Sequence, residues 1–233
     1  DGVALQFSSV SFDASLLDMF PAWLVGGVVV APSESVRRDF DALADLIRQH
    51  AVSHAFMPPA WLAGMPDENL PSLRQLITGG DVCDPDTIAR WSVGRAFHNI
   101  YGPTECTVLA TTVRFTPGSM PRCIGLPIAN VRCHVLDQQG NPVGTGEEGE
   151  LHIAGRGVGL GYLEQAEMNA ARYVPDPLDA AASMYKTGDL VRWCEDGHLE
   201  FIGRIDSQIK VRGFRVELGE IENAIRSEEH TSE

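Results

Sequence analysis

The chain has 233 residues, of which 44% are hydrophobic and 21% are charged, values typical of soluble globular proteins. This composition excludes a disordered chain, a collagen-like repeat and a coiled coil, and no apolar run has the roughly 18–20 residues of a membrane span. The formal net charge of −14 argues against nucleic acid or an anionic membrane as a partner, although a local phosphate site remains compatible with it.

Strand and helix patterns alternate through the first part of the chain. The helix expected from Ser35 has one apolar face, made of Phe40, Leu43, Leu46 and Ile47. Strands separated by helices imply a parallel sheet with right-handed crossovers. The expected strands are 5–12, 28–30, 52–57, 73–78 and 96–99, and the other expected helices are 15–25 and the one capped by Asp84 that runs through Trp91.

After Thr104 the pattern changes to short strands joined by Gly- and Pro-rich turns, which predicts a β-rich unit made mainly of hairpins. Beyond residue 206 we expect a strand over 208–211, a turn at Gly213 and a helix from Leu218. The expected strands of the β-rich unit are 108–115, 131–136, 150–154, 190–193 and 198–202.

These patterns divide the chain into an α/β subdomain with a parallel sheet (1–107), a β-rich subdomain (108–205) and the start of a further subdomain (206–225). The polar segment 226–233 resembles the translation of a sequencing-library adapter, and we interpret it as a non-native tail. Five cysteines without a C-x-x-C pair favour reduced thiols in a cytoplasmic protein over disulfides or a zinc site.

Neither common nucleotide-binding loop is present. The sequence lacks G-x-x-x-x-G-K-[ST], and the glycine-rich run Gly155–Gly161 fails the pattern G-x-G-x-x-G. We interpret that run as a turn between strands.

Five ordered motifs carry the functional signal. They resemble the core motifs of adenylate-forming enzymes, specifically the amino-acid-activating adenylation domains of nonribosomal peptide synthetases, and the resemblance covers residues 1 to 225. The motifs are Phe12–Ser15 (FDAS), Asn99–Glu105 (NIYGPTE), Gly149–Gly157 (GELHIAGRG), Tyr185–Leu190 (YKTGDL), and Gly203–Asp206 (GRID) with Val211–Glu220 (VRGFRVELGE).

The resemblance implies the adenylate-forming fold, in which an α/β subdomain with the amino-acid and adenine pocket precedes a distorted β-barrel with ribose-binding residues. It also implies ATP and Mg²⁺ as cofactors, a carrier domain bearing phosphopantetheine, and a condensation domain in the same synthetase. By the same resemblance a phosphate loop lies upstream of Asp1 and a catalytic lysine beyond Ile225. We therefore expect a fragment cut at both ends, with little adenylation activity alone.

The segment Tyr101–Glu105 follows an expected parallel strand, at the sheet edge where such sheets bind ligands. Its Gly-Pro turn presents an aromatic ring, a hydroxyl and a carboxylate, which suit a base, a phosphate and Mg²⁺. The resemblance assigns adenine packing to Tyr101, phosphate binding to Thr104 and the metal to Glu105, and makes the last two the catalytic residues. The alternative is a turn with incidental polar side chains.

The resemblance also assigns the ribose to Asp189, with Arg204 on the nucleotide and Phe201 on the adenine where the family commonly has tyrosine. Taken alone, Asp189 would be read as a hairpin-turn residue or a helix cap. The complete expected nucleotide set is Gly79, Gly80, Asn99, Ile100, Tyr101, Thr104, Asp189, Phe201 and Arg204.

Asp206 lies where the β-rich unit ends. The resemblance makes it the hinge for rotation of the following subdomain and places Lys210 on the thioester-forming face. A surface turn is the alternative for Asp206.

Asp13 is a carboxylate among apolar neighbours, so it must cap a helix, pair with a cation or bind a ligand. The resemblance assigns it to the α-ammonium group of the substrate, and the alternative is the N-cap of helix 15–25. The expected side-chain pocket is wholly apolar, which predicts a hydrophobic amino acid, aliphatic ahead of aromatic because Leu17 and Phe56 occupy volume. By the same resemblance the pocket consists of Ala14, Leu17, Phe56, Ile77, Gly79, Ile100, Val108 and Leu109, each of which could instead be ordinary core.

Two alternatives to amino-acid activation remain. An acyl- or aryl-CoA ligase of the same superfamily is disfavoured by Asp13 and by the segment 212–220. A non-catalytic nucleotide-binding or carrier-docking module belongs to a different functional class.

Overall fold

The computed structural model describes residues 2–66, 70–206, 209–211, 214–216 and 225–226. Its first half is the predicted parallel sheet, in which every pair of neighbouring strands is parallel. The order across this sheet is β2 (Val28–Val30), β1 (Val3–Leu5), β3 (His54–Phe56), β4 (Gln75–Gly79) and β5 (Ala96–Tyr101).

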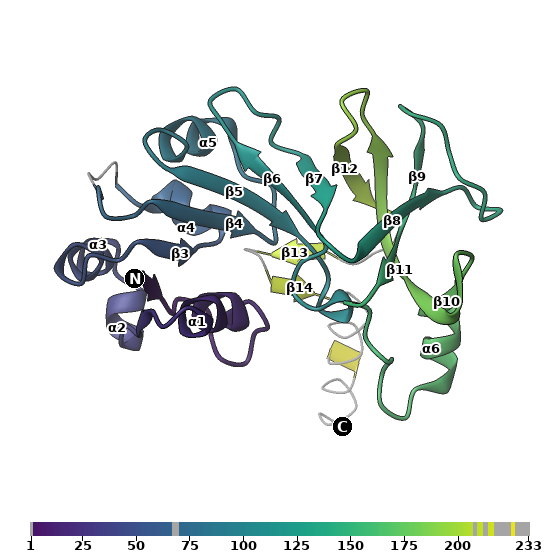
Figure 1. The fold of residues 1–233 in the computed structure, drawn as a ribbon, viewed down its shortest axis with the longest axis horizontal. Coiled ribbons are helices and arrows are strands. Elements are labelled where there is room, and N and C mark those ends of the chain that lie inside the picture. Colours follow the sequence, from purple (N-terminus) through teal and green to yellow (C-terminus); the bar gives the residue numbers. More distant parts are fainter. Residues whose placement is uncertain (1, 67–69, 207–208, 212–213, 217–224, 227–233) are drawn as a thin grey trace.

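Side-chain alternation along these strands builds a core on each face of the sheet. On β4, Leu76 belongs to one buried cluster and Ile77 to another, and Phe97 and Ile100 divide in the same way on β5. The first cluster packs against α3 (Phe40–Gln49), α4 (Pro59–Gly64) and α5 (Pro85–Trp91), and the second against α1 (Ser15–Leu24). Figure 1 shows α1 on one side of β3–β5 and α4 and α5 on the other.

The helix expected from Ser35 is in fact two helices, α2 (Glu34–Arg37) and α3. Asp39 has an extended backbone, which ends the first helix, and its side chain accepts from the Ala42 amide at 2.9 Å, which caps the second. The predicted apolar face is confirmed, because Leu43 and Ile47 are fully buried. The cap at Asp84 is also confirmed.

The second half is antiparallel, as predicted. Strand β6 pairs antiparallel with β5, so one continuous sheet joins the two halves. The order continues through β6 (Thr111–Phe115), β7 (Cys123–Pro127), β12 (Leu199–Arg204), β11 (Asp179–Trp193), β9 (Glu148–Gly155) and β8 (Val131–Leu136), with β10 (Tyr173–Asp176) on β11.

Several expectations about the elements were wrong. Strand β1 covers only Val3–Leu5 instead of the expected run 5–12, and helix α4, which begins at Pro59, was not predicted. The helix α6 (Ala166–Arg172) has no buried residue, so it has no apolar face that a sequence pattern would reveal. The short strands β7 and β10 were also not predicted.

The 3-10 turn η1 (Thr104–Cys106) follows β5, and a hairpin of β13 (Ile209–Val211) and β14 (Phe214–Val216) follows the main sheet. The predicted turn at Gly213, the helix from Leu218 and nearly all of the tail 226–233 lie outside the described residues, and the subdomain boundaries stay predictions. Within the described part of the chain, no helix combines the length and apolarity needed to cross a membrane.

Candidate active site

Most of the predicted side-chain pocket is brought together between α1 and the carboxyl ends of the parallel strands. Gly79 lies next to Ile100 in the same region, because a Cβ atom on Gly79 would be 2.4 Å from the Ile100 carbonyl oxygen. Val108 is not part of the cluster and has a positive φ of 68°. The buried members are Ala14, Phe56 and Ile100, and the partly buried ones are Leu17, Ile77 and Leu109.

Asp13 precedes α1 and is half-buried. Ala14 is the N-cap residue of that helix and no side chain caps it, so the capping alternative for Asp13 is wrong. Among the residues that the structure describes, none forms a hydrogen bond or ion pair with the Asp13 carboxylate. Asp13 therefore lies beside the apolar cluster with its charge available for a ligand.

Asp18, on α1, is a second carboxylate that the sequence reasoning missed. It is only 3% exposed and accepts from the backbone amides of Phe7 at 3.0 Å and Ser8 at 2.7 Å. Burial raises its pKa to about 6. These bonds attach α1 to the segment after β1, so Asp18 supports the helix that carries the cluster.

A pocket opens where β4, β5, β7 and β12 meet, next to the apolar cluster. It brings together five residues of the predicted nucleotide set, from three separate segments of the chain. Ile100 belongs both to this pocket and to the apolar cluster. The lining residues are Gly80, Asp81, Val82, Asn99, Ile100, Tyr101, Pro121, Arg122, Ile124 and Phe201.

Asn99 has one satisfied and one unsatisfied polar atom in this pocket. Its Nδ2 donates to the Cys123 carbonyl at 2.9 Å. Its Oδ1 is buried and has no hydrogen-bond partner within the described part of the chain. A buried acceptor without a donor is costly, so this oxygen suits a ligand that brings an N–H group.

Tyr101 and Asp189 meet although they are 88 positions apart in the sequence. The Tyr101 hydroxyl donates to Oδ2 of Asp189, and burial together with that carboxylate raises the pKa of Tyr101, so the hydroxyl stays protonated. Oδ1 of Asp189 accepts from Arg204 Nη1 at 2.8 Å. Asp189 lies inside β11 opposite Arg204 of β12, so the turn or helix-cap alternative is wrong.

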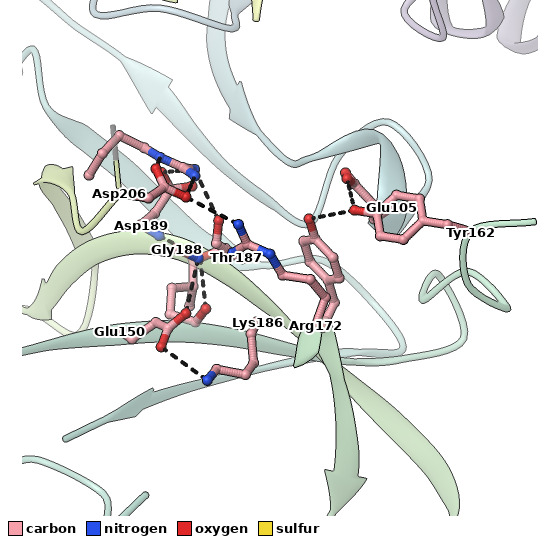
Figure 2. A network of polar contacts seen from close by, with 12 residues as sticks. Glu105, Glu150, Tyr162, Arg172, Lys186, Thr187, Gly188, Asp189 and Asp206 are labelled. Atoms are coloured by element: carbon pink, nitrogen blue, oxygen red, sulfur yellow. Dashed lines mark hydrogen bonds and ion pairs between the residues drawn. The ribbon is translucent and has the colours of Figure 1, made fainter. Parts of the chain in front are cut away.

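Asp206 extends this network (Figure 2). It accepts from Arg204 Nε at 2.9 Å and Nη2 at 2.6 Å, and from Arg172 Nη2 at 3.2 Å. Arg172 was missed because the short helix α6 was not predicted. The backbone of Lys210 lies in β13, while its side chain is outside the described structure.

Thr104 and Glu105 lie in η1, where Thr104 is exposed and Glu105 is half-buried. The Tyr162 hydroxyl donates to Glu105 (Figure 2). Among the described residues no group of three metal-ligating side chains exists. One carboxylate is nevertheless enough for Mg²⁺ carried by a nucleotide, because phosphates and water fill its other positions. The donor set therefore fits Mg²⁺.

Residues 1–163 match the family model of AMP-binding enzymes. The chain belongs to the AMP-binding enzyme family. Its curated relatives include the "Probable non-canonical nonribosomal peptide synthetase (NRPS) CymA" of Salinispora arenicola (strain CNS-205), 48% identical over 97% of this chain and 3% of the relative. Bacitracin synthase 3 of Bacillus licheniformis is 42% identical over 95% of the chain and 4% of the relative. The chain thus spans only a few per cent of these relatives' lengths.

Solved structures place this AMP-binding chain among adenylation domains. Holo-PA1221, a synthetase protein with adenylation and PCP domains bound to a vinylsulfonamide inhibitor, matches 97% of the chain and 41% of its own, at 30% identity and a TM-score of 0.90. The Vibrio cholerae adenylation domain AlmE, in complex with glycyl-adenosine-5'-phosphate, matches 97% of the chain and 45% of its own, at 27% identity and a TM-score of 0.86. The fold is therefore the adenylate-forming fold that the motifs implied.

Proposed function

We propose that this chain serves, as part of a longer synthetase, to activate a hydrophobic amino acid as its aminoacyl-adenylate and to deliver it to a carrier-bound phosphopantetheine thiol in nonribosomal peptide synthesis. In the first step the amino-acid carboxylate attacks the α-phosphate of MgATP and pyrophosphate leaves. One observation carries the proposal: Ile100 borders both the apolar cluster and the nucleotide pocket. A substrate side chain in one and an adenine in the other would bring the carboxylate and the α-phosphate together.

The proposed adenine site uses the unsatisfied acceptor of Asn99, which would receive the exocyclic amine of the base. Tyr101 and Phe201, which both line the pocket, would pack against the ring. Asp189 would bind the ribose, because its carboxylate keeps acceptor sites beyond the two bonds made here, and Arg204 would contact the nucleotide. Gly79 and Gly80 would allow close backbone approach to the base.

Glu105 would hold Mg²⁺ and Thr104 would contact the phosphates. The ion, when bound, supplies positive charge next to the triphosphate. The protein's part is to hold carboxylate, phosphate and metal in one geometry.

The proposed amino-acid site pairs Asp13 with the substrate α-ammonium group and places the side chain against the apolar cluster. Asp13 supports this assignment because its carboxylate has no partner in the described structure. A charged or hydroxylated side chain would lose its hydrogen bonds in the cluster, at a cost of about 1–3 kcal/mol or more. Valine, isoleucine or leucine is therefore the proposed substrate.

For the second half-reaction we propose that Asp206 is the hinge and that Lys210 belongs to the thioester-forming face. The partners would be a peptidyl carrier domain and a condensation domain of the same synthetase, and neither nucleic acid nor membrane. The carrier domain in holo-PA1221 supports the first of these partners. Five free cysteines support a reducing, cytoplasmic location.

The direct test is calorimetry of the full chain with a nonhydrolysable leucyl-adenylate analogue, for the native chain, Asp13→Ala and Asp86→Ala. Asp86 is an exposed carboxylate on α5, across the sheet from the cluster, and serves as the matched control. We expect Asp13→Ala to weaken binding about ten-fold or more, as for a charge-assisted hydrogen bond, and Asp86→Ala to leave it unchanged.

Equal affinity for the native chain and Asp13→Ala would instead favour an acyl- or aryl-CoA ligase, which has no ammonium group to bind. Tight binding of AMP without any contribution from the aminoacyl part would favour the non-catalytic nucleotide-binding or carrier-docking module.

A further inference from the structure

The glycine-rich run Gly155–Gly161, which was interpreted as a simple turn, lies directly against the loop that carries Glu105. The Gly159 amide donates to the Glu105 carbonyl at 2.8 Å, and Thr107 Oγ1 donates to the Gly157 carbonyl at 2.7 Å. A Cβ atom on Gly157 would lie 3.0 Å from the Cys106 carbonyl oxygen. Glycine thus allows the two loops to be fixed backbone against backbone.

The residue after this run reaches the Glu105 side chain itself. The Tyr162 hydroxyl donates to Glu105 Oε1 at 2.5 Å (Figure 2). It also lies 3.2 Å from the hydroxyl of Tyr185. A phenolic hydroxyl can donate its proton, and a carboxylate oxygen accepts, so Tyr162 is the donor in this contact. A donor in this place restricts rotation of the carboxylate.

Tyr162 is itself held by α6. Its backbone amide donates to Asn169 Oδ1 at 2.6 Å, and Asn169 Nδ2 donates to the Tyr162 carbonyl at 2.8 Å. The Tyr162 ring packs edge-on against Tyr173, with the ring centres 5.9 Å apart. The Asn169 side chain therefore binds both backbone groups of Tyr162, and the Tyr173 ring restricts the orientation of the Tyr162 ring. These contacts hold the Tyr162 hydroxyl in place next to Glu105.

We propose that Tyr162 is a positioning residue, which orients the Glu105 carboxylate for the Mg²⁺ of MgATP. This inference rests on the proposed function, which assigns the metal to Glu105. Carboxylates that bind metals are themselves held by hydrogen bonds, and loss of such an outer partner typically weakens metal binding about 10–100-fold.

The test compares Tyr162→Phe with Tyr173→Phe in the full chain. Both changes remove one hydroxyl from the same aromatic group, but the Tyr173 hydroxyl makes no hydrogen bond to the residues that the structure describes. Mn²⁺ affinity is measured by electron paramagnetic resonance with a nonhydrolysable ATP analogue bound, and analogue affinity is measured by calorimetry in EDTA. We expect Tyr162→Phe to weaken Mn²⁺ binding about ten-fold with the metal-free affinity unchanged, and Tyr173→Phe to change neither.

Unchanged Mn²⁺ affinity in Tyr162→Phe, or equal losses in both variants, would overturn the proposal. The variant Glu105→Gln distinguishes failure of this inference from failure of the proposed function. Mn²⁺ binding that is unchanged in Glu105→Gln would refute the assignment of the metal to Glu105. If Tyr162→Phe does not fold, Asn169→Leu is measured instead, since it frees the tyrosine backbone and keeps the hydroxyl. That variant must also weaken Mn²⁺ binding, and unchanged binding would refute the positioning role.

Discussion

Asp13 and Asp18 lie five positions apart and have opposite environments. Asp18 follows the buried Ala14 by four positions, so it shares the core-facing side of α1, where two backbone amides donate to it. Asp13 precedes the helix and has no partner in the described structure. Each carboxylate lies among apolar residues and needs a partner, but only the structure shows that the partner of Asp18 is the protein itself.

The raised pKa of Asp18 predicts a dependence of stability on pH. Burial raises this pKa from 3.8 to about 6, so the folded chain holds the proton over a range where the unfolded chain has lost it. The free energy of unfolding should therefore fall as pH rises from about 4 to 6, by roughly 3 kcal/mol, and this contribution should then stay constant. Urea unfolding at several pH values should show that Asp18→Asn loses this slope. A slope that persists in the variant would contradict the assignment.

The hydrogen bonding of Asn99 predicts that the pocket discriminates between adenine and hypoxanthine. With Nδ2 already bonded to the Cys123 carbonyl, only the Oδ1 acceptor remains for a ligand. Adenine offers a donor there, whereas hypoxanthine would present an oxygen to an oxygen. AMP should bind more tightly than IMP by about 1–3 kcal/mol, roughly 5–150-fold, and Asn99→Ala should lose most of this difference. Calorimetry with the two nucleotides measures it, and equal affinities in the native chain would refute the role of Asn99.

At the scale of elements, the pairing of β6 with β7 continues the sheet beyond the β5–β6 pair, where its parallel and antiparallel parts meet. Gly125 on β7 has a φ of +82°, and a Cβ atom there would lie only 2.0 Å from the Thr112 carbonyl oxygen of β6. Both the backbone conformation and the space therefore require glycine at this junction.

Gly125→Ala should consequently cost more stability than the same change at Gly140, which has a φ of +83° but open space around it. For Gly140→Ala we expect about 1 kcal/mol from the backbone conformation alone. For Gly125→Ala we expect more than about 2 kcal/mol, because β6 and β7 must also separate. Urea unfolding of the two variants checks the difference, and equal costs would show that the close approach of the strands is unimportant.

How far the sequence predicts the elements depends on how local their signals are. Val28–Val30 and Val131–Leu136 are strands with the bounds expected, because each is a short apolar or alternating run between turn residues. Asp84–Pro85 predicts its helix for the same reason, through a local cap. Helix α6 has no such signal, since it buries no side chain. Arg172, which it carries, could not be found without it.

The residues of the candidate site also differ in how local their sequence signals are. The members of the loop Tyr101–Glu105 are adjacent in sequence, so a motif reveals them together. The contact between Tyr162 and Glu105 spans 57 positions, and that between Tyr101 and Asp189 spans 88. Such pairs are created by the order of strands in the sheet, which hydrophobic periodicity does not specify.

For the whole molecule, the continuous sheet explains why one site draws on both halves of the chain. Tyr101 comes from β5 in the parallel part, while Asp189 and Phe201 come from β11 and β12 in the antiparallel part. The net charge of −14 is compatible with an anionic ligand because Arg204 and the pocket's polar groups act locally. The proposed function therefore requires the two halves of the chain to form one site for an amino acid and ATP.

Amino-acid-dependent exchange of pyrophosphate into ATP tests this account most directly. This chain covers 45% of the AlmE chain, so the assay uses a chimera in which CymA supplies flanking segments. We expect the greatest kcat/KM with valine, isoleucine or leucine, at least about ten-fold above serine, aspartate or lysine, and almost none with the matching carboxylic acids that lack the amino group. Preference for a charged amino acid, or equal exchange with a carboxylic acid that has no amino group, would contradict the account.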